Sequence, residues 1–182
     1  MNTLKLVLIL ATSLPLAAQE TPHAVVHSTG NSAQDTRPNS DQVPDVLALT
    51  GHFQRIVVLR FKYNTDLLAG LKRMIEQEKI RNAVILSAFG SVRNYQVQQV
   101  GNREFPPRDV FVKIPTAPAD ITGMSGFVIG GRVHPHITLA DADKAFGGHL
   151  EPDTTVFTFA VVTLGVLDDG LDLTRIDDWT YR

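Results

Sequence analysis

The chain has 182 residues, enough for one domain with a substantial core, and its 43% hydrophobic and 20% charged residues are typical of a globular protein. The formal net charge of −2 leaves no basic surplus of the kind that proteins use to grip nucleic acid. The sequence contains no cysteine, which excludes disulfides, thiolate zinc sites, iron–sulfur clusters and cysteine nucleophiles, so a metal site must use His, Asp, Glu or backbone oxygen.

Residues 1–18 have the layout of a secretory signal peptide. Lys5 makes the start positive, residues 6–16 are almost entirely apolar, and small residues ending at Ala18 precede a polar pair. The apolar run is shorter than the roughly 20 residues that a bilayer-spanning helix needs. We therefore expect cleavage after Ala18 and export, to the periplasm or out of the cell. The alternative is a buried N-terminal helix.

Residues 19–50 predict a flexible polar leader, because they are rich in turn formers and lack apolar periodicity. His23 and His27 have a spacing that would suit a metal site on a helix, but nothing in this segment predicts a helix. We interpret both histidines as part of a solvated tail, and the folded domain as residues 51–182.

The domain is predicted to begin with a strand over residues 55–61 and to continue with its clearest helix. Asn64-Thr65-Asp66 supplies capping residues. The apolar residues that follow recur at helical spacing, and they are Leu67, Leu68, Leu71, Met74 and Ile75. Charged residues fill the other positions, which indicates an amphipathic helix packed against a sheet.

The rest of the domain reads as strands over 83–89, 92–100, 109–114, 120–129, 133–141, 154–164 and 171–176. Gly90-Ser91 interrupts the first two, and Gly130-Gly131 predicts a tight turn before residue 133. One helix with many hairpin-linked strands predicts a single α+β domain, with a mostly antiparallel sheet flanked by helices.

Three of the six histidines lie in or just after the strand predicted over 133–141. His134 and His136 are two residues apart, so both side chains face the same side of a strand. Gly147 and Gly148 are expected to take positive φ and to bend the chain so that His149 joins them. Three imidazoles at one point suit a zinc-like ion with an open fourth position. The alternative is that these rings form hydrogen bonds in the core or lie on the surface.

Other side chains are candidates for the surroundings of this cluster. Asp141 either orients a histidine through its outer N–H or caps the turn after the strand. Asp120 or Asp141 together with two histidines would instead form a two-histidine, one-carboxylate iron site. Thr138 shares the face of the paired histidines. Arg93 is a candidate for holding an anion or else a solvated strand residue, and Gly90 either lines a cleft or forms a bulge.

These motifs, taken in chain order, resemble the plants and prokaryotes conserved (PPC) domain family. The resemblance covers about residues 51–180 and depends on three segments, which are Ala88-Phe89-Gly90-Ser91-Val92-Arg93-Asn94, His134-Pro135-His136-Ile137-Thr138-Leu139-Ala140-Asp141 and Gly147-Gly148-His149-Leu150. The chain departs from the family at Asp120, where glutamate is commoner, and around Ala160, where relatives often carry a glutamate.

The resemblance implies a homotrimer and, as in the prokaryotic branch, a histidine-bound metal, with zinc the expected ion. Together with the predicted signal peptide, the resemblance favours an exported protein that uses a three-histidine site to bind or transform a small molecule. A first alternative is DNA binding, as bacterial relatives are often labelled, although the Arg-Gly-Arg core of the plant AT-hook is missing here. A second is a trimeric structural or interaction module. No nucleophile elbow, P-loop or dinucleotide fingerprint indicates a reaction, so whether the protein is an enzyme stays open.

Overall fold

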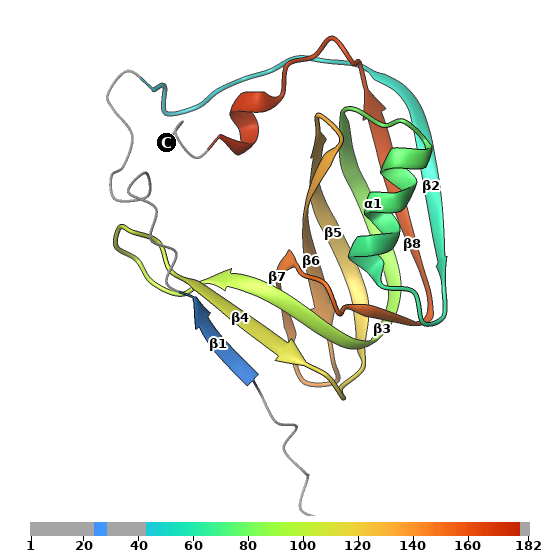
Figure 1. The fold of residues 1–182 in the computed structure, drawn as a ribbon, viewed down its shortest axis with the longest axis vertical. Helices are drawn as coiled ribbons and strands as arrows, with labels where there is room; N and C mark the ends of the chain where they lie inside the picture. Colours follow the sequence, from blue (N-terminus) through green and yellow to red (C-terminus); the bar gives the residue numbers. More distant parts are fainter. Residues whose placement is uncertain (1–23, 29–42, 179–182) are drawn as a thin grey trace, which may run out of the picture.

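A computed structural model describes residues 24–28 and 43–178 of the chain (Figure 1). Its elements in order are β1 (Ala24–Ser28), β2 (Phe53–Lys62), α1 (Leu67–Gln77), β3 (Ala83–Val100), β4 (Asp109–Ile114), β5 (Ala119–Ile129), β6 (Arg132–Ala140), β7 (Ala145–Leu150), β8 (Thr155–Leu167) and a 3-10 helix (Thr174–Asp177). All strand pairings are antiparallel, as the sequence predicts. A single α-helix lies among the described residues, so the expectation of several flanking helices is met only in part. The expected signal peptide lies outside these residues.

The long strand β3 organises the sheet, because each half of it has different neighbours. Its first part pairs with β5 and β8, whereas its last residues pair with β4 and β7. Strand β6 lies between β5 and β7, and β7 returns to β3, so the strands β3, β5, β6 and β7 close into a ring. Figure 1 shows β4 and the end of β3 reaching away from the body of the sheet as an arm, with β1 paired to the outer side of β4.

Gly90 bends β3 without ending it, which corrects the prediction of two separate strands. The strand pairing shifts register around Gly90, and this residue has φ 138°. A Cβ at this position would lie only 2.3 Å from the backbone oxygen of Phe159. A β-bulge with glycine at its centre therefore lets one strand continue through the bend.

Helix α1 covers one face of the sheet and fills the core, as its periodicity predicts (Figure 1). Asp66 is its N-cap, since the carboxylate accepts a hydrogen bond of 2.8 Å from the backbone N–H of Ala69. The buried side chains of the helix are Leu67, Leu68, Leu71 and Ile75, and they belong to the same core as the inward residues of the strands. No helix among the described residues is long and apolar enough to cross a membrane.

The structure differs from the predicted elements at both ends. In the leader, β1 pairs with β4, where no regular structure is predicted. Residues 171–176 are not a strand: a loop leads into the 3-10 helix Thr174–Asp177. Local hydrogen bonds explain the change, because the carboxylate of Asp172 accepts from the backbone N–H of Thr174 at 3.0 Å. Such a side chain satisfies the backbone locally and competes with strand pairing.

Candidate metal site

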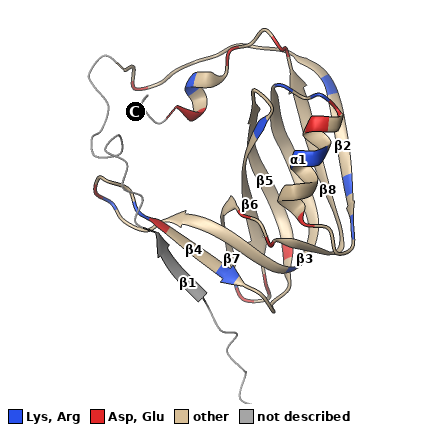
Figure 2. Ribbon diagram, in the orientation of Figure 1, with Lys and Arg blue, Asp and Glu red and all other residues tan. Residues whose placement is uncertain are grey.

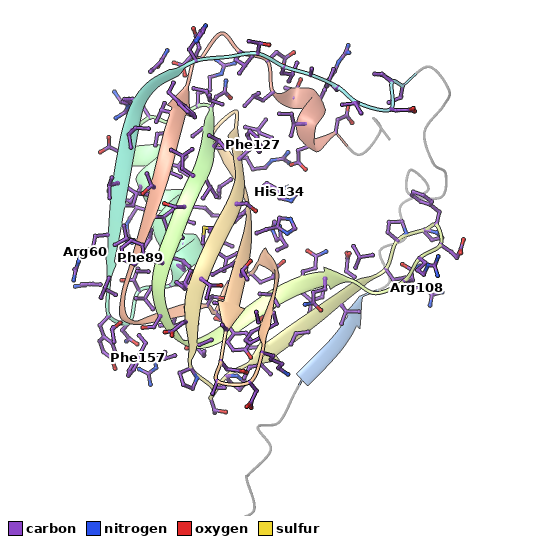
Figure 3. The ribbon with its side chains drawn as sticks, turned by 180° about the vertical axis from the view of Figure 1, so that it is seen from behind. Arg60, Phe89, Arg108, Phe127, His134 and Phe157 are labelled. Carbon is purple, nitrogen blue, oxygen red and sulfur yellow. The ribbon has the colours of Figure 1, made fainter. Side chains whose placement is uncertain are left out.

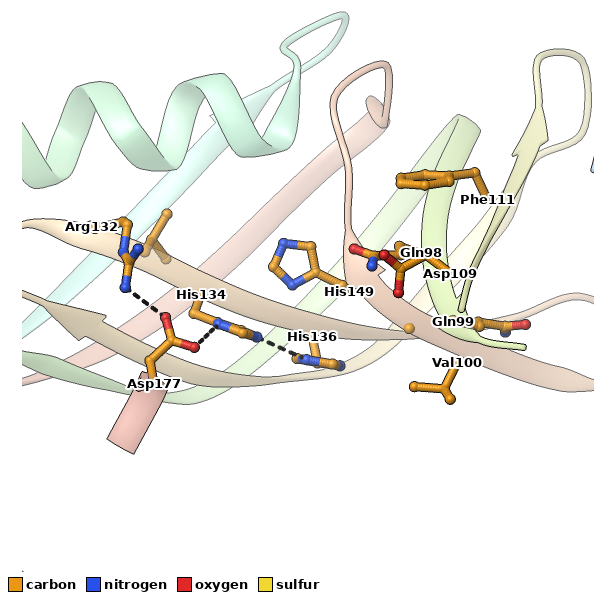
Figure 4. A pocket seen from close by; sticks show the side chains of 12 residues that line it. Gln98, Gln99, Val100, Asp109, Phe111, Arg132, His134, His136, His149 and Asp177 are labelled. Carbon is orange, nitrogen blue, oxygen red and sulfur yellow. Dashed lines mark hydrogen bonds and ion pairs between the residues drawn. The ribbon is translucent and has the colours of Figure 1, made fainter. Parts of the chain in front are cut away.

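The three predicted histidines lie together on two neighbouring strands (Figure 4). His134 and His136 project from β6, and His136 is directly opposite His149 of β7 in the strand register. The Nε2 atoms of His134 and His136 are 3.3 Å apart, and one nitrogen of each ring lies within 4.8 Å of the others. The three residues therefore form a group that could hold a metal ion.

Gly147 and Gly148 bring His149 to this group by a different route from the predicted bend. Both are part of strand β7, and neither has a positive φ, so that expectation is wrong. A Cβ on Gly147 would lie 2.1 Å from the backbone oxygen of Ile137, and one on Gly148 would lie 2.3 Å from that of Gln98. The glycines are required because β7 lies very close to β6 and β3.

Asp177 and Arg132 complete the surroundings of His134, and neither is among the site residues predicted from the sequence. One carboxylate oxygen of Asp177 lies 2.9 Å from Nδ1 of His134, and the other accepts a hydrogen bond of 2.8 Å from Arg132. Arg132 is two residues before His134 on β6, so strand alternation alone places both on one face. Asp177 comes from the 3-10 helix, and its approach to β6 depends on tertiary structure.

The histidines line an open pocket of about 720 Å³ (Figure 4). Arg132 and Asp177 lie on one side of it, and Gln98, Asp109 and Phe111 line it from the arm of β3 and β4. The histidine group is therefore open to small molecules, which could contact it together with charged, amide and aromatic side chains.

Asp141, Asp120 and Thr138 are not among the residues that line the pocket. Of the two roles predicted for Asp141, the contacts are those of a cap on the turn after β6. Its carboxylate accepts 2.9 Å hydrogen bonds from the backbone N–H groups of Asp143 and Lys144. These bonds lower the pKa of Asp141. Asp120 is exposed on β5, and Thr138 lies further along β6, opposite Gly147.

Arg93 also lies outside the pocket and is engaged elsewhere. Its guanidinium donates hydrogen bonds to the hydroxyl of Tyr63 at 2.9 Å and to the side-chain oxygen of Asn64 at 3.3 Å. The same group lies 5.8 Å from the centre of the Tyr63 ring. Arg93 therefore links β3 to the loop before α1, and the structure gives it no ligand-binding role at the histidines.

The pKa values of two of the three histidines are lowered, which favours the uncharged form that metal coordination requires. Burial lowers the pKa of His149 to about 4, and the neighbouring rings of His134 and His136 act in the same direction. Burial, followed by the effect of His134, also lowers the pKa of His136. Uncharged rings carry a nitrogen lone pair for an ion near neutral pH.

We predict that the metal-free protein loses stability as the pH falls from about 6.5 to about 4. In this window the unfolded chain protonates His149, whereas the folded chain holds that ring uncharged, so acid favours unfolding. The loss is at most about 3 kcal/mol and is reduced by solvent screening around the half-buried ring.

Urea unfolding of the metal-free protein across this pH range measures the effect. His149→Gln is the matched variant, because it keeps a polar side chain that does not titrate. The dependence on pH should be shallower in the variant than in the wild type. Equal slopes for the two proteins would contradict the prediction.

Comparisons with known proteins place this architecture in a family. The sequence model of the Plants and Prokaryotes Conserved (PCC) domain matches residues 48–168. The Bifunctional protein GlmU of Synechococcus sp. (strain JA-2-3B'a(2-13)) is 30% identical over 114 residues, which are 60% of this chain and 16% of that protein. The chain thus spans less than a fifth of the length of the curated relatives it matches.

Two solved structures show the same fold. The metal-containing protein AF0104 from Archaeoglobus fulgidus is 24% identical, with a TM-score of 0.55 over 66% of this chain and 86% of that one. A plant- and prokaryote-conserved (PPC) protein from Pyrococcus horikoshii is 19% identical, with a TM-score of 0.54 over 68% of this chain and 85% of that one. From the match over residues 48–168, the chain belongs to the Plants and Prokaryotes Conserved domain family.

Proposed function

We propose that this chain is an exported protein that holds a zinc ion with His134, His136 and His149 and binds or transforms a small molecule beside it. The observation that carries the proposal is the approach of three imidazole nitrogens to within 4.8 Å of one another in an open pocket. Groups of this kind with room for a further ligand are typical of catalytic zinc sites.

The donor set favours zinc over other ions. Among the described residues the group consists of three imidazoles without a carboxylate. Three nitrogen ligands suit a tetrahedral zinc ion, whereas the iron alternative needs a carboxylate ligand. A protein of the same fold, AF0104, is described as metal-containing, which is compatible with the proposal.

The residues around the group suggest how a small molecule would be handled. Bound zinc would polarise an oxygen of the ligand or lower the pKa of a bound water to about 7. Asp109 lines the pocket and is our candidate for accepting or returning a proton. It replaces Asp120 and Asp141, which lie outside the pocket lining. Arg132 is largely exposed at the other side and can contact a negatively charged group of the ligand.

We also propose that the protein is a homotrimer, and an apolar surface on the outer face of β2, β3 and β8 supports self-association. This surface consists of Ile56, Val58, Leu86, Phe89 and Phe157, which are between 44% and 65% exposed. Figure 3 shows Phe89 and Phe157 near Arg60, well away from His134. Exposed apolar patches of this kind mark interaction surfaces, so subunits could associate here and leave the histidine pocket open.

DNA binding finds little support in the distribution of charge. Figure 2 shows Lys and Arg without Asp or Glu on β2, whereas on α1 and over the rest of the described chain acidic residues lie among the basic ones. The whole chain has a net charge of −2. A DNA-binding role would require affinity that falls steeply with added salt, which a titration at two salt concentrations would reveal.

Size-exclusion chromatography with light scattering and elemental detection tests the proposal on protein recovered from outside the cytoplasm. We expect a peak with the mass of three chains that carries about one zinc ion per chain. A metal-free peak at any pH near neutrality would contradict the metal site, whereas a metal-containing monomer would contradict only the trimer. Recovery solely from the cytoplasm, with residues 1–18 intact, would contradict export.

A further inference from the structure

We infer that Asp177 is a positioning residue, which fixes His134 as an Nε2 ligand and makes the C-terminal segment 168–178 part of the metal site. The inference builds on the proposed function, because it concerns how one of the proposed ligands is held. The match to the family model ends at residue 168, so Asp177 lies in a part of the chain that the model does not cover.

The contact between Asp177 and His134 determines which nitrogen of the ring is free. Nδ1 of His134 lies 2.9 Å from a carboxylate oxygen, and a carboxylate accepts but does not donate, so Nδ1 must carry the proton. The lone pair of the uncharged ring is then on Nε2. That atom faces Nε2 of His136 at 3.3 Å, which is the side of the ring where an ion would lie. The carboxylate thus selects the tautomer that can bind metal.

Arg132 holds the same carboxylate from its other side. Its guanidinium donates a 2.8 Å hydrogen bond to the second oxygen of Asp177. The Asp177 side chain is 15% exposed, whereas that of Arg132 is 70% exposed. Both carboxylate oxygens of the largely buried Asp177 therefore have a partner, His134 for one and Arg132 for the other. This arrangement leaves little rotational freedom for Asp177 and hence for the ring of His134.

The C-terminal segment is anchored to the sheet before it reaches the site. Leu173 is 3% exposed and packs in a small cluster with Ile129 and Leu167. The side-chain amide of Asn82, which is itself buried, donates a 2.8 Å hydrogen bond to the backbone oxygen of Leu171. These contacts hold the 3-10 helix beside β6, in the position from which Asp177 reaches His134 (Figure 4).

Asp177→Asn is the decisive variant, because it keeps the shape of the side chain and removes its charge. We expect zinc affinity, measured by competition with a chromophoric chelator, to fall about 10–100-fold, as is typical when the outer partner of a ligating histidine is lost. Arg132→Leu should cost less, because the contact between Asp177 and His134 remains. Asp169→Asn is the matched control, since it removes one negative charge from the same segment outside the pocket lining, and its affinity should stay within about 2-fold of the wild type.

Two further readouts separate positioning from a general structural role. Nitrogen-15 NMR of the metal-free protein should show His134 with its proton on Nδ1 in the wild type and a mixture of tautomers in Asp177→Asn. The thermal midpoint of the metal-free variant should change little, because asparagine keeps the shape of the Asp177 side chain and the largely exposed guanidinium of Arg132 remains hydrated without its partner.

The possible failures are distinguishable. If the wild type binds zinc and Asp177→Asn binds it equally well, the positioning role is overturned and the proposed function stands. A His134 ring protonated on Nε2 in the uncharged wild type would also overturn the positioning role. A wild type that binds no zinc would overturn both.

Discussion

Replacing His149 with alanine is expected to weaken zinc binding by more than about 100-fold. This exceeds the usual effect of losing a residue that only hydrogen-bonds to a ligating histidine. The reason is that His149 supplies one of the three nitrogens. The two histidines that remain on β6 would form only a weak two-ligand site, of the kind that occurs by chance on protein surfaces. His136→Ala should have an effect of similar size. Competition with a chromophoric chelator at pH 7 measures both affinities.

Loss of the ligand must be distinguished from loss of the fold. His149 is half-buried and lies beside two other imidazoles, so the metal-free variant should unfold at nearly the same temperature as the metal-free wild type. His52→Ala is the matched control, because His52 is exposed before β2 and does not line the pocket. A control variant with the same loss of affinity, or a His149→Ala variant with none, would contradict the three-histidine site.

The strand that carries the paired histidines could be predicted well from the sequence, because it depends on local rules. Alternation along β6 places His134 and His136 on one face, and Gly130-Gly131 makes the turn before it, with φ values of 57° and 84°. Helix α1 and its cap at Asp66 likewise follow from spacing and residue type. Each of these features is determined by residues within one element or turn.

The parts that could not be predicted depend on contacts between distant segments. Gly147 and Gly148 resemble a flexible bend in sequence, but close approach to the backbone of β6 and β3 is what requires them. Asp177 lies in a run where Leu171 and Leu173 alternate with polar residues, which is typical of a strand. Only the folded sheet shows that this segment turns toward His134. The cluster of three histidines was thus readable from the sequence, but the carboxylate that contacts one of them was not.

The close approach of β6 and β7 leads to a prediction about stability. Gly147→Ala is expected to lower the unfolding free energy of the metal-free protein by about 3 kcal/mol, at the upper end of the range for overpacked positions. The added Cβ would lie 2.1 Å from the backbone oxygen of Ile137, a distance that backbone atoms cannot tolerate without moving apart. For a chain of this size the thermal midpoint should fall by about 6–12 °C.

Gly123→Ala provides the matched control within the same sheet. Gly123 lies in β5, its Cβ would meet no atom within 4 Å, and its φ is not positive. Alanine there should leave stability unchanged or raise it by up to about 1 kcal/mol, because glycine costs conformational entropy in a strand. If Gly147→Ala and Gly123→Ala unfold at the same temperature, the close packing of β7 against β6 is wrong.

The same variant links the packing of the strands to the metal site. Zinc that binds only the folded state raises the thermal midpoint by an amount that grows with its affinity. If alanine at residue 147 pushes β7 away from β6, it also moves His149 away from His134 and His136, since His136 and His149 are direct partners across these strands. Zinc should therefore raise the midpoint of Gly147→Ala by less than that of the wild type, while Gly123→Ala should respond fully. A full zinc response in Gly147→Ala would mean that the strand spacing does not set the geometry of the three nitrogens.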